Sequence, residues 1–187
     1  HSLPCRTQRY FPRPHKLIVL IPAKAGFQKE SPGRKYERVA DNNNNHTPDY
    51  IESIGIAADS AKYILNNVMG FKEVAQDEDG IYDIYVHALQ GGYWGITQSV
   101  NADGYNPSYI SLRNDYSDMS QRCSNIEDLV WLTVGHEYFH AVQLEYRKLT
   151  IEPYFKEFTS MWFEAIFVPS CFDFLNFVDM HSSYSLF

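Results

Sequence analysis

The run His-Glu-Tyr-Phe-His, from His136 to His140, constrains this chain more than any other feature. Two histidines four residues apart lie on one face when the segment is helical, and each can then place a ring nitrogen about 2.0–2.1 Å from the same ion. Glu137 follows His136 directly and is turned roughly 100° from it around a helix, so its carboxylate lies near the ion without having to bind it. This spacing predicts a zinc site with an adjacent base on a helix.

The residues around this run have the signals of a long helix. Ser124 and Glu127 have capping-box spacing, and the helical pattern extends from there to about Arg147. Two further helices are predicted, one from the N-cap Thr47 to Gly70 and one from Pro153 to just before Pro169. The motif therefore belongs to the second of three predicted helices.

Four β-rich runs accompany these helices, separated by Gly, Asn and Pro clusters. We expect an α+β fold with a small mixed or antiparallel sheet, largely antiparallel in its second half. The 187 residues, 44% of them hydrophobic, are enough for a single domain spanning 1–187. Its sheet-rich part with one long helix would be 1–120, and its helical metal-site part 121–187. The predicted strands are "KLIVLI" (16–21), "GIYDIYVHAL" (80–89), "GGYWGITQ" (91–98) and "PSYISLRND" (107–115).

Charge and hydropathy limit the kinds of partner that the chain is expected to bind. The formal net charge of −7 gives no electrostatic case for nucleic acid, and the best candidate for a membrane span, the six-residue run "KLIVLI", is far too short. We therefore expect a partner that is neutral, cationic or peptidic, and the peptidase hypothesis below makes it a peptide or protein substrate. The chain begins at His1 instead of methionine, as expected for a processed product or a fragment, and a secreted or extracellular location is the expectation. Cys5, Cys123 and Cys171 could form one disulfide with a thiol left over, or be three small buried side chains.

A catalytic zinc needs three protein ligands and one open position, so a third donor should follow the motif. Glu157 and Glu164 are the two carboxylates that compete for this role. Glu164 lies in the apolar run "MWFEAIF", where an unpaired carboxylate would be costly to bury and a metal would offset that cost. Glu157 lies in the polar run "FKEF" and could be a solvated charge. The sequence favours Glu164.

The combination of "HEYFHAVQ" and "WFEA" resembles the gluzincin metallopeptidases. The wider order of "DNNNNHTPDYIES", "IYDIYV", "GGYWGIT" and "SYISLRNDYS" resembles the MXAN_6640-like family of secreted bacterial metalloproteases. This resemblance implies a zincin-like fold, with His136, His140 and Glu164 as zinc ligands and Glu137 as the base that activates the zinc-bound water.

The chain departs from that resemblance after the third ligand. An acidic segment is expected there, but the sequence reads "FVPSCFDF". Gluzincins also use a later His or Tyr to stabilise the oxyanion, and the late candidates are His181 and Tyr184. The end of the chain so soon after Glu164 suggests that part of the cleft is truncated.

Two functions follow from these observations. The first is a zinc-dependent metalloendopeptidase, whose peptide substrate would lie extended beside an edge strand at "GGYWGIT". The alternative is a non-catalytic, metal-stabilised extracellular module for binding, adhesion or assembly, derived from a peptidase. A structural zinc site would be closed by a fourth protein ligand, whereas a catalytic site would leave that position open. Glu137 favours the enzyme, because a structural site has no use for a base next to its first ligand.

The run "DNNNNHTPDYIE" is a candidate calcium loop. Its oxygen donors have the spacing of an EF-hand loop, although His46 occupies the position where a glycine normally makes the sharp turn. The alternative is an Asn-rich turn that only caps the next helix. The candidate ligands at loop positions 1, 3, 5, 7, 9 and 12 are Asp41, Asn43, Asn45, the Thr47 carbonyl, Asp49 and Glu52.

Overall fold

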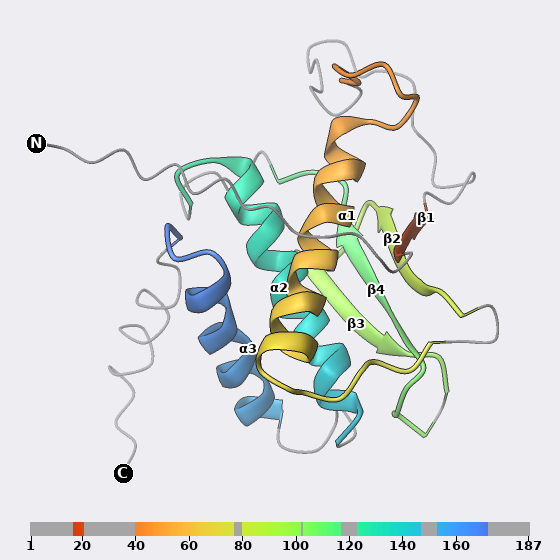
Figure 1. Ribbon diagram of the computed structural model, residues 1–187, viewed down its shortest axis with the longest axis vertical. Coiled ribbons are helices and arrows are strands. Elements are labelled where there is room, and N and C mark those ends of the chain that lie inside the picture. The colour runs from red at the N-terminus through yellow and green to blue at the C-terminus, as the bar shows by residue number, and fades with distance from the viewer. Residues whose placement is uncertain are drawn as a thin grey trace, which may run out of the picture.

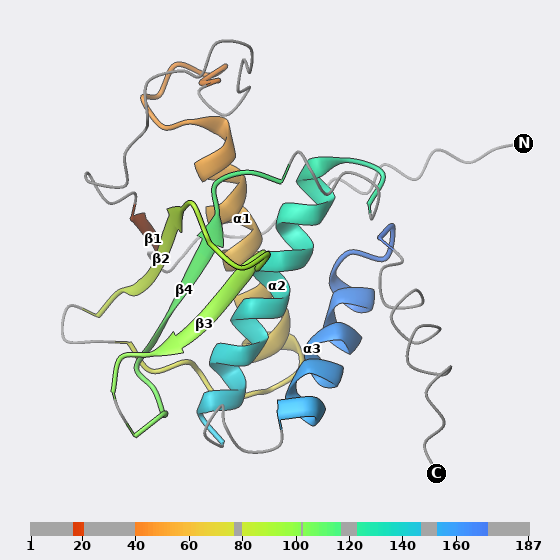
Figure 2. The same ribbon diagram turned by 180° about the vertical axis from the view of Figure 1, so that it is seen from behind.

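Three helices lie on the same side of a small mixed sheet in the computed structural model (Figures 1 and 2). The structure describes residues 17–20, 40–76, 80–101, 103–116, 123–146 and 153–171. This is the α+β arrangement that the sequence predicts. None of the helices within the described ranges is both long and apolar enough to cross a membrane.

The sheet has the order β1-β2-β4-β3. Its strands are β1 (Leu17–Leu20), β2 (Tyr82–His87), β3 (Gly95–Ser99) and β4 (Ser108–Arg113). β1 pairs with β2 and β2 with β4 in parallel, while β3 pairs with β4 antiparallel. The expectation of a largely antiparallel second half is therefore wrong for β2 and β4, because β4 lies between β2 and β3 instead of outside them. β3 is left at one edge of the sheet.

The helices begin and end close to their predicted positions, although the N-cap of α1 is Pro48 and not Thr47. α1 (Asp49–Lys62) continues as the π-helical turn η2 (Tyr63–Val68), α2 is Ile126–Leu144, and α3 is Pro153–Phe167. Asn125, and not Ser124, caps α2: its Oδ1 accepts a hydrogen bond of 2.8 Å from the backbone N–H of Asp128. An acceptor at this position satisfies one of the free amide groups of the first turn.

The core is built where α1 and α2 pack on the sheet, and α3 packs on the outer side of α2 (Figure 2). A layer arrangement of this kind buries α2 on most of its surface, which explains the apolar run before the motif. The core includes Ile54 and Leu65 from the first helical segment, Ile84, Ile110 and Leu112 from the sheet, and Leu129, Leu132, Val134 and Tyr138 from α2.

A glycine in α2 and a disulfide at the ends of the helices keep α3 close to α2. A Cβ at Gly135 would lie 2.5 Å from Cδ1 of Phe167, which is too close. The absence of a side chain at Gly135 therefore allows the two helices to approach. Glycine in a helix costs about 1 kcal/mol relative to alanine, and the close packing offsets that cost. A disulfide between Cys123 and Cys171 joins the start of α2 to the residues that follow α3.

Candidate metal centre

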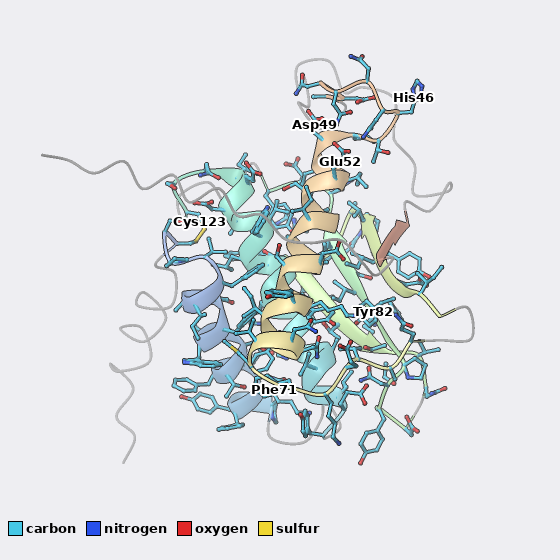
Figure 3. All side chains as sticks on the ribbon, in the orientation of Figure 1. His46, Asp49, Glu52, Phe71, Tyr82 and Cys123 are labelled. Carbon is cyan, nitrogen blue, oxygen red and sulfur yellow. A yellow bond between two sulfur atoms is a disulfide. The ribbon has the colours of Figure 1, made fainter. Side chains whose placement is uncertain are left out.

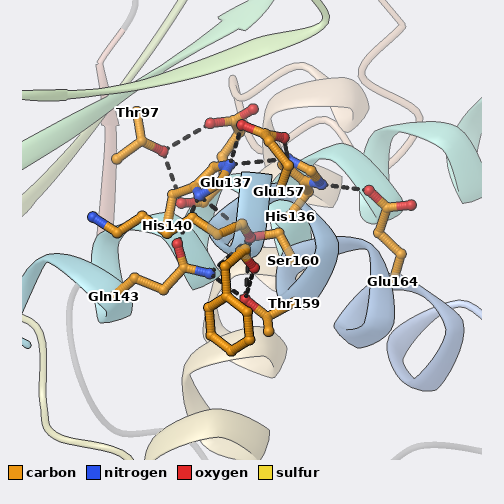
Figure 4. A network of polar contacts seen from close by, with 11 residues as sticks. Thr97, His136, Glu137, His140, Gln143, Glu157, Thr159, Ser160 and Glu164 are labelled. Atoms are coloured by element: carbon orange, nitrogen blue, oxygen red, sulfur yellow. Dashed lines mark hydrogen bonds and ion pairs between the residues drawn. The ribbon is translucent and has the colours of Figure 1, made fainter. Parts of the chain in front are cut away.

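The two motif histidines present their Nε2 atoms to one point between α2 and α3 (Figure 4). The Nε2 atoms of His136 and His140 are 3.0 Å apart, and their rings are nearly perpendicular. Glu157 of α3 reaches the same point, with one carboxylate oxygen 3.2 Å from Nε2 of His136 and the other 3.3 Å from Nε2 of His140. These three side chains form a group whose nitrogen and oxygen atoms could hold a metal ion.

The other ring nitrogen of each histidine already has a partner. Nδ1 of His136 contacts the buried carboxylate of Glu164. Nδ1 of His140 lies 2.9 Å from Oε1 of Gln143 and 3.3 Å from Oγ of Ser160. Because a carboxylate and a carboxamide oxygen only accept hydrogen bonds, both Nδ1 atoms carry a hydrogen. In the neutral form of each ring, Nε2 is then the nitrogen with the lone pair.

The orientation of Gln143 is fixed by α3. Its Nε2 donates to the backbone oxygen of Lys156 at 3.0 Å and lies 2.9 Å from Oγ1 of Thr159. With the amide nitrogen used in this way, the amide oxygen faces His140. Metal-binding histidines commonly have their second ring nitrogen held by such an outer partner.

Nε2 of His136, Nε2 of His140 and the Glu157 carboxylate face one point, and their distances show whether a zinc ion would fit there. Two Nε2 lone pairs and a carboxylate cannot face one another unless a cation lies among them. Tetrahedral ligands at about 2.1 Å from zinc are about 3.4 Å apart, so the observed separations of 3.0, 3.2 and 3.3 Å need only a small opening. The donor set and its spacing therefore fit a zinc ion.

Without a metal, a proton on His136 supplies the positive charge that these three groups need between them. Burial alone would lower the pKa of His136, but the hydrogen bonds to Glu157 and Glu164 outweigh it and raise that pKa to about 10. Hydrogen bonds from His136 and His140 hold the pKa of Glu157 well below its usual range, against the opposing effect of burial. The group thus keeps a positive charge among its acceptors at neutral pH.

The structure brings Glu157, and not Glu164, to the two Nε2 atoms. Glu164 is buried as the sequence predicts, but it contacts Nδ1 of His136, the ring nitrogen that points away from the shared point. The reason is the register of the two antiparallel helices: Glu157 lies four residues into α3 and His140 four residues before the end of α2. Glu157 is therefore level with His140, while Glu164 lies two turns further along α3.

Glu137 lies beside this group without belonging to it. Its side chain is buried and turns toward β3, where Oγ1 of Thr97 is 2.8 Å from its Oε2 (Figure 4). Sequence reasoning missed Thr97, Gln143 and Ser160. Gln143 had a local signal, because it lies one turn after His140, but Thr97 becomes a neighbour only when β3 packs on α2.

An open cavity of about 630 Å³ lies between β3 and the two helices. Tyr93, Trp94 and Ile96 line its strand side, and Leu132 and Met161 line its helix side together with the metal-site residues. Among the described residues, no fourth His, Cys, Asp or Glu joins the three-residue group. His136, His140 and Glu157 all line this cavity.

The candidate calcium loop lies at the N-terminal end of α1, and its last two candidate ligands, Asp49 and Glu52, belong to the first turn of that helix (Figure 3). The Asp41 carboxylate accepts hydrogen bonds from the backbone N–H groups of Asn45 at 3.1 Å and His46 at 2.8 Å. His46 has φ 70°, the left-handed conformation that glycine would adopt at this position. Further polar contacts in the loop run from the Asn42 side chain to Asp49, from Asn43 and Asn45 to Glu52, and from the Thr47 N–H to Asn45.

The late oxyanion candidates, His181 and Tyr184, lie outside the described residues, as does Cys5. Comparison of the chain with protein-family models, curated proteins and solved structures gives no significant match. The resemblance to the gluzincins therefore depends on the sequence motifs alone.

Proposed function

We propose that this chain is a zinc-dependent metalloendopeptidase. The observation that carries the proposal is the convergence of Nε2 of His136, Nε2 of His140 and the Glu157 carboxylate in an open cavity beside Glu137. Three protein donors with one side open are typical of catalytic zinc, whereas structural zinc has four protein donors.

His136, His140 and Glu157 would hold the ion. Zinc bound there would act as a Lewis acid toward a peptide carbonyl and toward water. The contacts of Glu164 with His136 and of Gln143 with His140 fix both rings so that their Nε2 atoms stay directed at one point.

Glu137 is the proposed general base. Its carboxylate is buried beside the donor group yet is not one of the donors, so it can accept a proton from the attacking water. The same carboxylate would then give that proton to the amine of the leaving peptide. Because the side chain is held by Thr97, the base does not have to be ordered in each cycle.

The substrate would lie along β3. β3 is an edge strand, and residues 92–97 line the strand side of the cavity. The outer backbone groups of an edge strand can pair with an extended peptide, which would place one amide bond next to Glu137. This part of the proposal defines a peptide in extended conformation as the substrate class.

The alternative is a non-catalytic extracellular module in which the ion only stabilises the fold. The chain's departure from the expected acidic segment after Glu164 favours it. The open side of the donor group among the described residues, and the position of Glu137, favour the enzyme. For either function we propose a secreted protein, because disulfides such as Cys123–Cys171 persist in oxidising compartments.

The substitution Glu137→Gln tests the function. It keeps the shape of the side chain and removes its ability to take a proton, so hydrolysis of a fluorogenic casein substrate should fall at least about 100-fold while zinc per chain stays constant. Glu127→Gln changes an exposed glutamate in the first turn of the same helix and should leave both unchanged. Undiminished hydrolysis by the Glu137→Gln variant would rule out the proposed base.

A further inference from the structure

We infer that the edge strand β3 positions the catalytic base, through Thr97, which binds one oxygen of Glu137, and Gly95, which leaves the space that this side chain occupies. This inference rests on the proposed function, because it assigns a role relative to Glu137 as a base. Thr97 and Gly95 are positioning residues: neither is in the donor group, and both act through Glu137.

Thr97 contacts Glu137 twice. Its hydroxyl oxygen is 2.8 Å from Oε2 of the Glu137 carboxylate and 2.8 Å from the backbone oxygen of the same residue. Both side chains are buried, with 6% of each residue exposed. A hydroxyl has one hydrogen to donate, and a hydrogen bond to an ionised carboxylate is stronger than one to a neutral carbonyl. The hydroxyl of Thr97 therefore donates to Oε2 whenever Glu137 is ionised.

This contact distinguishes the two oxygens of Glu137. Oε2 is occupied by Thr97, and among the described residues no hydrogen bond to Oε1 is found. Oε1 is thus the oxygen free to accept a proton from water. A carboxylate without such a partner could rotate and present either oxygen, which would lower the fraction of time spent in a productive orientation.

Gly95 supplies the space. A Cβ built on Gly95 would lie 2.5 Å from Cγ, 3.0 Å from Cδ and 3.0 Å from Oε1 of Glu137. The φ angle of Gly95 lies outside the left-handed region, so the backbone there suits any residue and the glycine is needed only for room. Any other side chain at this position would displace the Glu137 side chain.

The two positions act from one face of the strand. Residues two apart on a β-strand point to the same side, so Gly95 and Thr97 both face α2. The side chain of Glu137 lies between them and the helix from which it comes. Strand β3 therefore serves two purposes in the proposal: its edge meets the substrate, and its inner face fixes the base.

The test compares Thr97→Val, which removes the hydroxyl at nearly constant shape, with Thr97→Ser, which keeps it. Thr97→Val should lower kcat on the order of 10-fold to 100-fold with KM and zinc content unchanged, and Thr97→Ser should restore kcat to within about threefold of wild type. Gly95→Ala should also lower kcat. Ser99→Ala removes a hydroxyl from the same face of β3 without touching Glu137 and should match wild type.

A purely structural contact would give a different pattern. If Thr97 only docks β3 on α2, the Thr97→Val variant would lose thermal stability while its kcat stayed at the wild-type value, and that result would overturn the inference. Equal losses of kcat in Thr97→Val and Thr97→Ser would also overturn it, because the hydroxyl would then not be the active group.

A double-mutant cycle on the zinc-free chain separates this inference from the proposed function. Thr97→Val and Glu137→Ala should have non-additive effects on the unfolding midpoint if the hydroxyl and the carboxylate interact. Additive effects would contradict the contact. If the wild-type chain binds zinc but cleaves no peptide, the proposed function is wrong. The double-mutant cycle would still show whether the Thr97 hydroxyl interacts with Glu137.

Discussion

Gln143 lies one turn after His140 on α2, and its amide oxygen is 2.9 Å from Nδ1 of that histidine. The amide nitrogen of Gln143 lies within hydrogen-bonding distance of three oxygen atoms of α3, so the amide cannot rotate without breaking those contacts. One helix thus fixes the ring orientation of a ligand on its neighbour.

Gln143→Leu should weaken zinc binding by about 10-fold to 100-fold, because His140 loses the acceptor that fixes its ring. Gln143→Glu keeps an acceptor and should retain more of the affinity. The control is Gln98→Leu, which changes an exposed glutamine on β3. Competition against a chromophoric chelator measures all three, and equal affinity in Gln143→Leu and wild type would contradict the role.

Glu157→Ala should cost more zinc affinity than Glu164→Ala. Glu157 faces both Nε2 atoms, whereas Glu164 only contacts Nδ1 of His136. Loss of an outer partner costs about 10-fold to 100-fold in affinity, and loss of a ligand should exceed that. The same chelator competition tests the order. The reverse order would return Glu164 to the role of third ligand that the sequence favours.

Zinc affinity should rise with pH. Zinc must displace the proton that the metal-free site holds on His136, whose pKa is raised to about 10, so binding releases a proton throughout the neutral range. We expect affinity to increase about tenfold per pH unit between about pH 7 and about pH 9. Isothermal titration in buffers of different ionisation enthalpy would count the protons released, and a pH-independent affinity would contradict the protonated site.

The metal-free protein should show the opposite trend in stability. A pKa that is raised on folding stabilises the fold fully below the ordinary value of 6.5, and this contribution is lost as the pH rises through about 10. Thermal unfolding of zinc-free protein at several pH values is the matching control.

Loss of the disulfide should destabilise the whole domain. The bridge closes a loop between residues 48 positions apart, for which the chain-entropy estimate is about 4 kcal/mol of unfolding free energy. We expect the double variant Cys123→Ser, Cys171→Ser to unfold at lower urea concentration than wild type. Cys5→Ser removes a cysteine that is not part of this bridge and serves as the control. An unchanged urea midpoint would show that the bridge contributes little.

The Asn-rich loop is predicted to bind calcium. Millimolar calcium should raise the unfolding temperature of wild type, and Glu52→Gln should reduce that shift by removing a charged donor. The Glu52 carboxylate already contacts the side chains of Asn43 and Asn45, so the residues needed to surround an ion are close together. Magnesium at the same concentration controls for ionic strength. An absence of any shift would leave the loop as a helix cap.

The helices could be predicted from the sequence because their signals are local. Capping residues, prolines at helix starts and apolar periodicity place α1, α2 and α3 within a few residues of their observed bounds. Even here, the neighbouring Asn125 takes the capping role expected of Ser124. The parallel pairing of β2 with β4 has no local signal, because it depends on which strands are neighbours in space.

For the candidate metal site too, some residues could be predicted from local sequence and others depend on the packing of the helices. The motif identifies His136 and His140 as candidate ligands because residues four apart lie on one face of a helix. The choice between Glu157 and Glu164 depends on how far α3 is shifted along α2, which is set by the connecting residues and the packing of the two helices. Burial argued for Glu164, and the structure confirms that burial, but a buried carboxylate can be stabilised by a histidine as well as by a metal.

The three donors of the candidate metal site come from two helices, α2 and α3, which pack closely at Gly135. An ion held by all three donors can bind only the state in which α3 is packed on α2, so ion binding and helix packing must stabilise each other to the same extent. Partly folded chains, in which α3 has not yet packed, would release the metal. Zinc retention would then report that folding is complete, and activity would be limited to molecules that have reached that state.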